Sequence, residues 1–197
     1  MTSAELVALR RNVVVLGHQG DETAVRPMLQ HNDSIIRELA LGALHRMGAL
    51  TDDDLSSAVA DADLLVRRRA AELSAEYPMV DLAPLLDDRE PVVIEMAIWS
   101  YGERVDIDDT ILDTLISLTT EHDDALVREA GAAALGAIGD DRAIPAILKA
   151  CTDKPAVRRR AVLALAPFSG PEVEAAIDTA LNDRDWQVRQ SAEDLRR

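Results

Sequence analysis

The feature that most constrains the fold of this chain is a repeat of about 30 residues. It is clearest in residues 124–154, DALVREAGAAALGAIGDDRAIPAILKACTDK. This stretch predicts a helix over residues 125–138, because small and apolar residues recur from Val127 at i, i+4, i+7, i+8 and i+11 and share one face. Gly139 ends that helix, and a second apolar helix follows over residues 143–150, with Pro145 in its first turn. One such pair cannot bury both of its apolar faces, so we expect copies of it to stack.

The same helix pair recurs along the whole chain. We expect the first helix of each pair, here called first-type, over residues 3–17, 35–48, 63–76, 91–103, 125–138, 155–168 and 185–195. The second-type helices are expected over residues 24–31, 52–60, 80–86, 109–121, 143–150 and 171–181. The pattern therefore predicts an all-α fold, an α-solenoid (superhelix) of about six to seven helix pairs, forming a single domain over residues 1–197.

Equivalent positions in the first-type helices are occupied by arginine in all cases but one. They are Arg37, Arg67, Ile94, Arg128, Arg158 and Arg189, separated by 30, 27, 34, 30 and 31 residues. The surrounding pattern, D-x-x-V-R-x-x-A-x-x-A-L-G, resembles the short HEAT-like repeats of phycobilisome lyase subunits, and the resemblance spans essentially all 197 residues. It implies that the first-type helices line the concave side of the solenoid.

The resemblance also implies a structural ladder of recurrent aspartates and arginines that links neighbouring repeats. Carried over, the ladder positions are Asp33, Arg37, Asp63, Arg67, Asp124, Arg128, Asp153, Arg158, Asp185 and Arg189. An aspartate just before a helix can accept hydrogen bonds from its free N–H groups, and an arginine can donate across to the next layer. Where Ile94 replaces arginine, we expect the ladder to break or to be replaced by apolar packing.

The net charge limits the kinds of partner that we expect, and the cysteine content indicates the cellular compartment. The formal net charge of -15, from 36 acidic and 21 basic residues, opposes binding to nucleic acid, which depends on clustered lysine and arginine. Cys151 is the one cysteine, so the chain can form no internal disulfide and no zinc site of several thiolates, and a reducing cytoplasm fits best. The chain has no 18-residue apolar span, so we expect a soluble protein that does not bind a membrane.

No pattern of catalytic, cofactor-binding or metal-binding residues can be recognised. HEAT-like iron hydroxylases carry His-Glu pairs in the repeat, whereas His18, His31, His45 and His122 are followed by Gln, Asn, Arg and Asp. HEAT-like DNA glycosylases have a basic concave face with aromatic residues, which a net charge of -15 and 3% aromatic residues do not match. Phosphate loops and nucleophile elbows are also missing, so we expect no enzymatic activity and no cofactor.

The candidate binding surface comes from the residues four and five places after each ladder position. These are Val13, Val14, Leu41, Ile98, Trp99, Ala132, Ala133, Val162 and Leu163. Either this row packs against the adjacent repeat, or it forms a shallow apolar stripe that docks a helix or extended segment of a partner.

We place the centre of the candidate site in residues 91–106. There the repeat spacing is irregular, Ile94 replaces arginine, and Trp99 and Tyr101 supply two of the chain's five aromatic residues. The candidate partner-binding residues are Leu41, Glu95, Ile98, Trp99, Tyr101 and Leu163. The alternative is that Trp99 and Tyr101 fill space left by the irregular packing.

The resulting functional hypothesis is a cytoplasmic, non-catalytic scaffold or adaptor that binds another protein or a peptide segment. The alternative is a lyase-type chaperone or enzyme that handles a tetrapyrrole or similar planar cofactor, as the resemblance implies. The first helix lacks a partner helix and carries Val13 to Val15 together. We therefore also expect either a weak homodimer through the N-terminal end or a fold-back of residues 1–5 as a cover.

Overall fold

The chain forms helices throughout the computed structural model, which describes residues 2–197. The α-helices are α1 (Ser3–Gln19), α2 (Glu22–Val25), α3 (Ser34–Arg46), α4 (Asp52–Val59), α5 (Leu64–Leu73), α6 (Pro91–Gly102), α7 (Asp109–Glu121), α8 (Ala125–Ile138), α9 (Ile144–Ala150), α10 (Pro155–Ala164), α11 (Pro171–Ala180) and α12 (Trp186–Leu195). Four short 3-10 helices complete the set: η1 (Arg26–Gln30), η2 (Ser74–Glu76), η3 (Ala83–Asp87) and η4 (Asp141–Ala143). These residues contain no strand, and the prediction of an all-α solenoid is confirmed.

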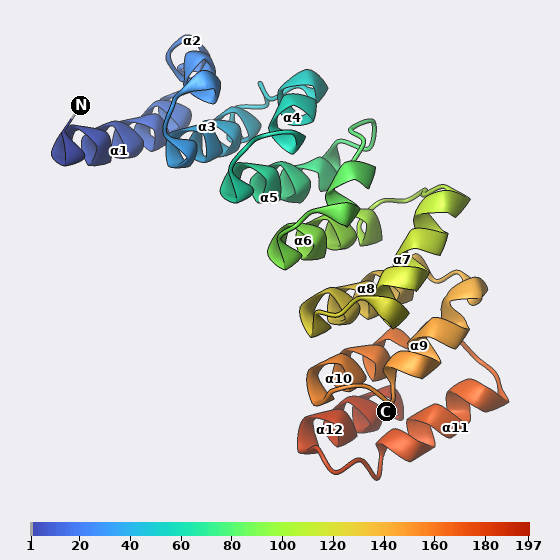
Figure 1. The fold of residues 1–197 in the computed structure, drawn as a ribbon. Helices are drawn as coiled ribbons and strands as arrows, with labels where there is room; N and C mark the ends of the chain where they lie inside the picture. The colour runs from blue at the N-terminus through green and yellow to red at the C-terminus, as the bar shows by residue number, and fades with distance from the viewer. Residues whose placement is uncertain (1) are drawn as a thin grey trace. The chain divides into compact units, whose positions relative to one another are not determined.

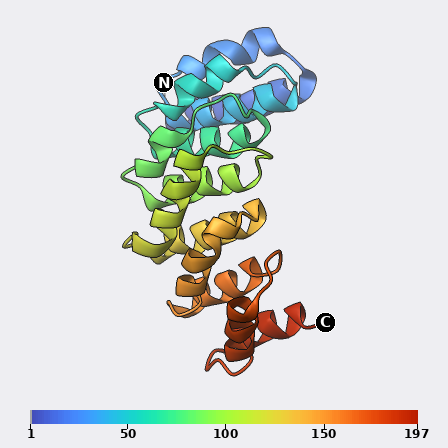
Figure 2. The ribbon, with the colours of Figure 1, turned by 90° about the vertical axis from the view of Figure 1, so that its right-hand side faces the viewer.

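The helices group into two compact units, which divide between Asp87 and Asp88. In the first unit, α1, α3 and α5 form one row of helices, and α2 and α4 form a second row beside it (Figure 1). In the second unit, α6, α8, α10 and α12 form one row, and α7, α9 and α11 form the second (Figure 1). The view of Figure 2 shows the layers of each unit following one another in chain order. Each core lies between its two rows, with Leu44 and Leu55 buried in the first unit and Leu112 and Leu135 in the second. The single domain expected from the sequence stays a prediction.

Two second-type helices are shorter than the sequence pattern predicts. Over residues 24–31 the α-helix ends at Val25 and continues as η1, which contains Pro27. Over residues 80–86 the chain forms only η3, which contains Pro84. Proline has no N–H to donate and disfavours the α conformation of the residue before it, so it limits both segments to tighter single turns.

The N-terminal ends of the first-type helices are joined by arginine–aspartate pairs. Arg128 in α8 donates from Nε and Nη2 to the two carboxylate oxygens of Asp153, which precedes α10, at 2.5 and 2.9 Å. The same bidentate arrangement joins Arg37 to Asp61 and Arg158 to Asp183, at 2.6 to 2.8 Å. Two parallel charge-assisted bonds set the orientation of both groups as well as their distance. Each of these arginines therefore connects its own helix to the start of the next first-type helix.

The ladder arginines also bind the loop that precedes their own helix. Nη1 of Arg128 donates to the carbonyl oxygens of His122 and Asp123, at 2.7 and 2.9 Å. Corresponding bonds run from Arg67 to the carbonyl oxygens of Asp61 and Ala62, and from Arg189 to that of Asp183. Arg189 therefore keeps its local role in the last helix.

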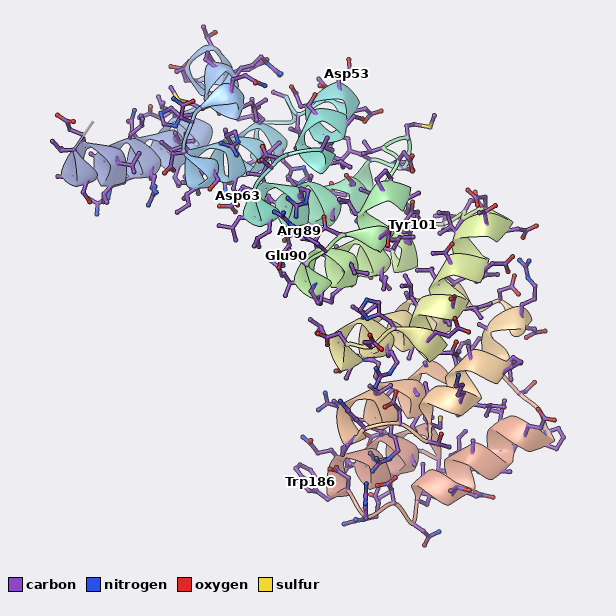
Figure 3. The ribbon with its side chains drawn as sticks, in the orientation of Figure 1. Asp53, Asp63, Arg89, Glu90, Tyr101 and Trp186 are labelled. Atoms are coloured by element: carbon purple, nitrogen blue, oxygen red, sulfur yellow. The ribbon has the colours of Figure 1, made fainter. Side chains whose placement is uncertain are left out.

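Most of the predicted ladder aspartates cap their own helices, as expected, but do not receive a ladder arginine of the preceding layer. Asp63, Asp124 and Asp185 accept hydrogen bonds from backbone N–H groups at the start of their own helices, and Figure 3 shows Asp63 at the start of α5. Asp33 caps α3 in the same way and also forms a bidentate pair with Arg10. Of the predicted set, Asp153 is the one that receives a ladder arginine.

The other carboxylates that receive ladder arginines, Asp61 and Asp183, lie two residues before the cap, which corrects the predicted ladder. Their Oδ1 atoms also accept the backbone N–H of Asp63 and Asp185, so each turns the entry loop toward the preceding helix. Hydrogen bonds from Arg158 hold the pKa of Asp183 below its usual value, and those from Arg128 do the same for Asp153.

The ladder is interrupted at Ile94, which is buried in α6. The corresponding residue before α8 is His122, whose Nδ1 accepts the N–H of Asp124 at 3.0 Å, as the Asp183 carboxylate does for Asp185. An accepting Nδ1 belongs to the neutral imidazole. At this junction the arginine and the carboxylate of the ladder pair are therefore both absent, so no half-buried carboxylate is left without its arginine.

The C-terminal ends of the first-type helices meet through glycine and alanine. A Cβ added to Gly136 in α8 would lie 2.7 Å from the Cα of Ala164 in α10. Similar contacts join Gly102 to Ala134 and Gly17 to Ala43, at 3.0 and 2.7 Å for the nearest atom. A side chain at these glycines would overlap the next helix of the same row, so the close approach of neighbouring first-type helices depends on them.

The N-terminal end of the first helix is closed by its own residues. The side chain of Thr2 accepts the N–H of Glu5, and Glu5 accepts the N–H of Thr2, which forms a capping box. Residues 2–5 therefore begin α1 and do not fold back as a cover; Met1 lies outside the described residues.

The ladder yields a first prediction. Arg128→Ala should lower the free energy of unfolding by about 1–3 kcal/mol, because it leaves Asp153 and two loop carbonyls without their donor. Arg142 is the matched control: it forms ion pairs with Asp109 and Asp140 at 2.8 and 2.9 Å, yet its side chain is half exposed. Arg142→Ala should change stability little, because exposed ion pairs contribute little. Equal losses in urea denaturation would contradict the structural role of Arg128.

The glycine contacts yield a second prediction. Gly136→Ala should destabilise the protein by about 1–3 kcal/mol through overpacking against Ala164. The double variant Gly136→Ala/Ala164→Gly should lose less stability than the sum of the two single variants, because the second change returns the space that the first one takes. Thermal or urea unfolding of the three variants measures this coupling, and strictly additive losses would show that the contact does not limit the packing.

Candidate interaction surface on α6, α8 and α10

The predicted surface row divides into a buried half and an exposed half. In the second unit, the residues four places after the ladder position are Ile98, Ala132 and Val162, and all are fully buried. The residues five places after it are Trp99, Ala133 and Leu163, and the exposed fractions of Trp99 and Leu163 are 42% and 37%. One residue rotates the side-chain direction by about 100°, so the first set faces the adjacent helix and the second faces outward. The first alternative, packing against the adjacent repeat, therefore describes the buried half, and the docking of a partner on the exposed half stays a prediction.

Three of the candidate partner-binding residues lie in the core, which corrects the predicted site. Leu41, Ile98 and Tyr101 are almost completely buried and cannot contact a partner in this conformation. Tyr101 lies on α6 (Figure 3), and the guanidinium of Arg104 stands 4.8 Å from the centre of its ring. The space-filling alternative thus describes Tyr101 and does not describe Trp99.

The other candidates lie on or near one pocket of about 420 Å³ in the second unit. It is lined by Glu95, Trp99, Gly102 and Glu103 from α6 and the residue that follows it, by Leu126, Glu129, Ala130, Ala133, Ala134 and Ala137 from α8, and by Arg160 from α10. The wall that α8 contributes consists largely of alanine, whose short side chains leave space beside Trp99. Leu163 extends the exposed apolar surface along α10, one turn after Arg160.

Of the three glutamates that line the pocket, one has arginine neighbours and two do not. Glu95, Trp99 and Glu103 follow one another at intervals of four residues, which places them on one face of α6. Within residues 2–197, neither Glu95 nor Glu103 forms a side-chain hydrogen bond or an ion pair. Glu129, by contrast, lies 3.5 Å from Arg159 and 3.8 Å from Arg160. The pocket therefore presents an exposed indole between two carboxylates that have no counter-ion.

A larger pocket, of about 520 Å³, lies in the first unit next to η1, α3 and α4. Its charged side chains are already paired, since Arg37 binds Asp61 and Asp54 binds Arg26 at 2.8 Å. It is also without an aromatic residue other than His31. The smaller pocket beside Trp99 is therefore the better candidate for binding.

Two other observations concern metal binding and the reactivity of the cysteine. No cluster of three or more His, Cys, Asp or Glu side chains in this part of the chain could hold a metal ion. Burial raises the pKa of Cys151 to about 12, so its thiol is protonated at neutral pH and is a poor nucleophile. Among the same residues, no helix is long and apolar enough to cross a membrane.

The sequence analysis missed Glu103, Arg160 and the alanine wall of the pocket. The spacing of Glu95, Trp99 and Glu103 was a usable signal, because a period of four on a helix brings all three to one face. The alanines could not be recognised as a wall from the sequence, since alanine is equally common at buried contacts between helices.

Comparison with known proteins agrees with the fold. Residues 79–156 match the family described as HEAT repeats. The comparison with curated protein sequences gave no match.

Similar solved structures include the Escherichia coli protein YibA, with 18% identity and a TM-score of 0.66 over 98% of this chain and 74% of YibA. An engineered protein has 21% identity and a TM-score of 0.64 over 89% of this chain and 96% of its own. A designed armadillo repeat protein in complex with the peptide (KR)4 has 16% identity and a TM-score of 0.60, over 88% and 97% of the two chains.

These findings define the class of the protein as an α-solenoid. Within that class, the match of residues 79–156 to HEAT repeats and the repeat-protein neighbours of similar fold support a HEAT-like repeat protein. Nothing in the comparisons points to the phycobilisome lyases in particular, so that closer resemblance stays a hypothesis.

The division of the surface row yields a third prediction. Ile98→Ala should lower the free energy of unfolding by about 2–5 kcal/mol, because it opens a cavity at a fully buried site. Trp99→Ala, at the next residue of the same helix, should cost less, because 42% of the Trp99 surface is already in contact with water. Urea denaturation of the two variants compares them directly, and a larger loss for Trp99→Ala would assign Trp99 to the core.

Proposed function

We propose that the protein is a non-catalytic scaffold that binds an extended segment of another protein on the exposed face of α6, α8 and α10. The observation that carries this proposal is the position of Trp99, which is 42% exposed and faces a pocket instead of the core. Exposing an indole to water is unfavourable, and buried aromatic anchors contribute much of the energy of protein interfaces. A partner that covers Trp99 would recover this energy.

The arrangement of the face supports an extended segment over a bulky ligand. Trp99, Ala133 and Leu163 occupy equivalent positions in three successive first-type helices, so a partner running across the helices would meet one of them in each layer. Among the proteins of similar fold, the designed armadillo repeat protein is in complex with a peptide. That likeness supports the same use of a repeat surface in this chain.

The proposal includes a cytoplasmic location and excludes nucleic acid and membranes as partners. The net charge of -15 opposes contact with polyanions and with anionic lipid surfaces. A single, partly buried cysteine suits a reducing compartment. A second copy of the chain is a further candidate partner, because Val7 and Val15 on α1 are exposed and could support a weak homodimer through the N-terminal end.

The alternative function, handling of a tetrapyrrole or similar planar cofactor, has no specific observation in its favour. It makes a different prediction for the purified protein, which would then carry visible absorbance. A bound coloured cofactor in protein isolated from its source would therefore replace the scaffold proposal.

The scaffold proposal yields a fourth prediction, which uses the two tryptophans as a matched pair. Trp186 begins α12 and is 65% exposed, and Figure 3 shows it at the outer edge of its unit. A partner captured from the source cell and purified should bind the wild type and Trp186→Ala alike. Its affinity for Trp99→Ala should fall about 30-fold, which corresponds to the 2 kcal/mol of an interface hot spot.

Isothermal titration of the three proteins measures these affinities, and circular dichroism confirms that each variant is folded. Equal affinities for the wild type and Trp99→Ala would remove the α6, α8 and α10 face as the binding site.

A further inference from the structure

We propose that the pocket beside Trp99 binds a cationic side chain of the partner segment and prefers arginine to lysine. This inference rests on the proposed function and adds the chemistry of the residue that is bound. Four features of the pocket support it: the position of the two glutamates, the exposed indole, the alanine wall and the location of Arg160.

The glutamates bracket the indole along α6. Glu95 lies one turn before Trp99 and Glu103 one turn after it, each about 6 Å away along the helix axis at 1.5 Å per residue. A cation that sits within about 6 Å of the ring is attracted by the face of the indole. Glu95 and Glu103 lie one turn to either side of Trp99, so their negative charges add to the attraction of the ring.

The pocket carries negative charge that the protein itself leaves unbalanced. Glu95 and Glu103 have no ion pair within the residues that the structure describes, whereas Glu129 lies between Arg159 and Arg160. Two neighbouring carboxylates raise the local negative potential, and a bound cation would neutralise it. A neutral or anionic side chain would gain nothing from this field.

The alanine wall suits the stem of a long basic side chain. Ala130, Ala133 and Ala137 present methyl groups opposite Trp99, and Leu126 adds an apolar edge. The methylene groups of arginine or lysine can lie along such a surface while the charged head reaches the carboxylates. A guanidinium is planar, stacks on indole and is more weakly hydrated than an ammonium, so arginine fits better than lysine.

Arg160 makes the two ends of the pocket differ in charge. It lies on α10, at the edge opposite to Glu95 and Glu103, and repels a second cation there. The bound cation is therefore held on the α6 side, against Trp99. The partner residue that follows toward α10 meets Leu163, which is exposed and apolar.

The test uses four acetylated and amidated eight-residue peptides in which alanine alternates with arginine, lysine, glutamine or norleucine. The protein is the full chain with Trp186→Phe, which leaves Trp99 as its one tryptophan and makes its fluorescence a local reporter. We expect the arginine peptide to change this fluorescence and to bind at least tenfold more tightly than the glutamine and norleucine peptides. The lysine peptide should bind severalfold more weakly than the arginine peptide.

Matched charge variants separate this site from general attraction to an acidic protein. Glu95→Gln/Glu103→Gln should lower the affinity for the arginine peptide at least tenfold. The control Asp113→Asn/Glu172→Gln removes the same number of charges from the exposed faces of α7 and α11 and should change the affinity less than twofold. Equal effects of the two double variants, or equal binding of the arginine and glutamine peptides, would overturn the inference.

Its failure can be told apart from failure of the proposed function. If the cellular partner still depends on Trp99 while the arginine peptide does not bind, the scaffold proposal stands and the cationic side chain is wrong. If partner binding does not depend on Trp99, the proposed function fails. If the lysine and arginine peptides bind equally, the stacking of a guanidinium on the indole is wrong.

Discussion

The bidentate pairs between an arginine of one first-type helix and an aspartate before the next set the orientation of successive layers wherever they occur. Arg128 binds both oxygens of Asp153 and, with its remaining nitrogen, two carbonyls of its own entry loop. One planar group therefore sets the direction of a loop and the position of the following layer together. Apolar packing between helices is less specific in angle, so the arginines restrict how neighbouring helices can rotate against one another.

At the other end of the same helices, glycine and alanine bring the backbones together. Gly136 against Ala164 and Gly102 against Ala134 leave no room for a side chain between neighbouring helices of the same row. These glycine contacts join α6 to α8 and α8 to α10 at their C-terminal ends, and an arginine–aspartate pair also joins α8 to α10. Gly102 and Ala134 line the pocket beside Trp99 as well, so the close contact between α6 and α8 helps to set the geometry of the pocket.

Much of the fold could be predicted from the sequence, and the site only in part. The period of about 30 residues is a direct consequence of one helix pair per layer, so it specifies the solenoid. The separation of Ile98 from Trp99 into core and surface depends on the rotation between α6 and α8, which no local pattern encodes. The partner of Arg158 was likewise misplaced, because an aspartate that caps a helix and one that faces the preceding layer differ by only two positions in the chain.

The contact between α6 and α8 lacks the ladder ion pair, which bears on how similar layers are told apart during folding. Layers with nearly the same sequence can in principle stack in the wrong order during folding. Where Ile94 meets the loop of His122, the usual ion pair is absent on both sides. An arginine-bearing helix docked before α8 would find no carboxylate at His122, and α6 docked before α10 would leave Asp153 without its arginine. The side-chain contacts at this junction therefore differ from those between α8 and α10, although the two junctions join helices of similar sequence.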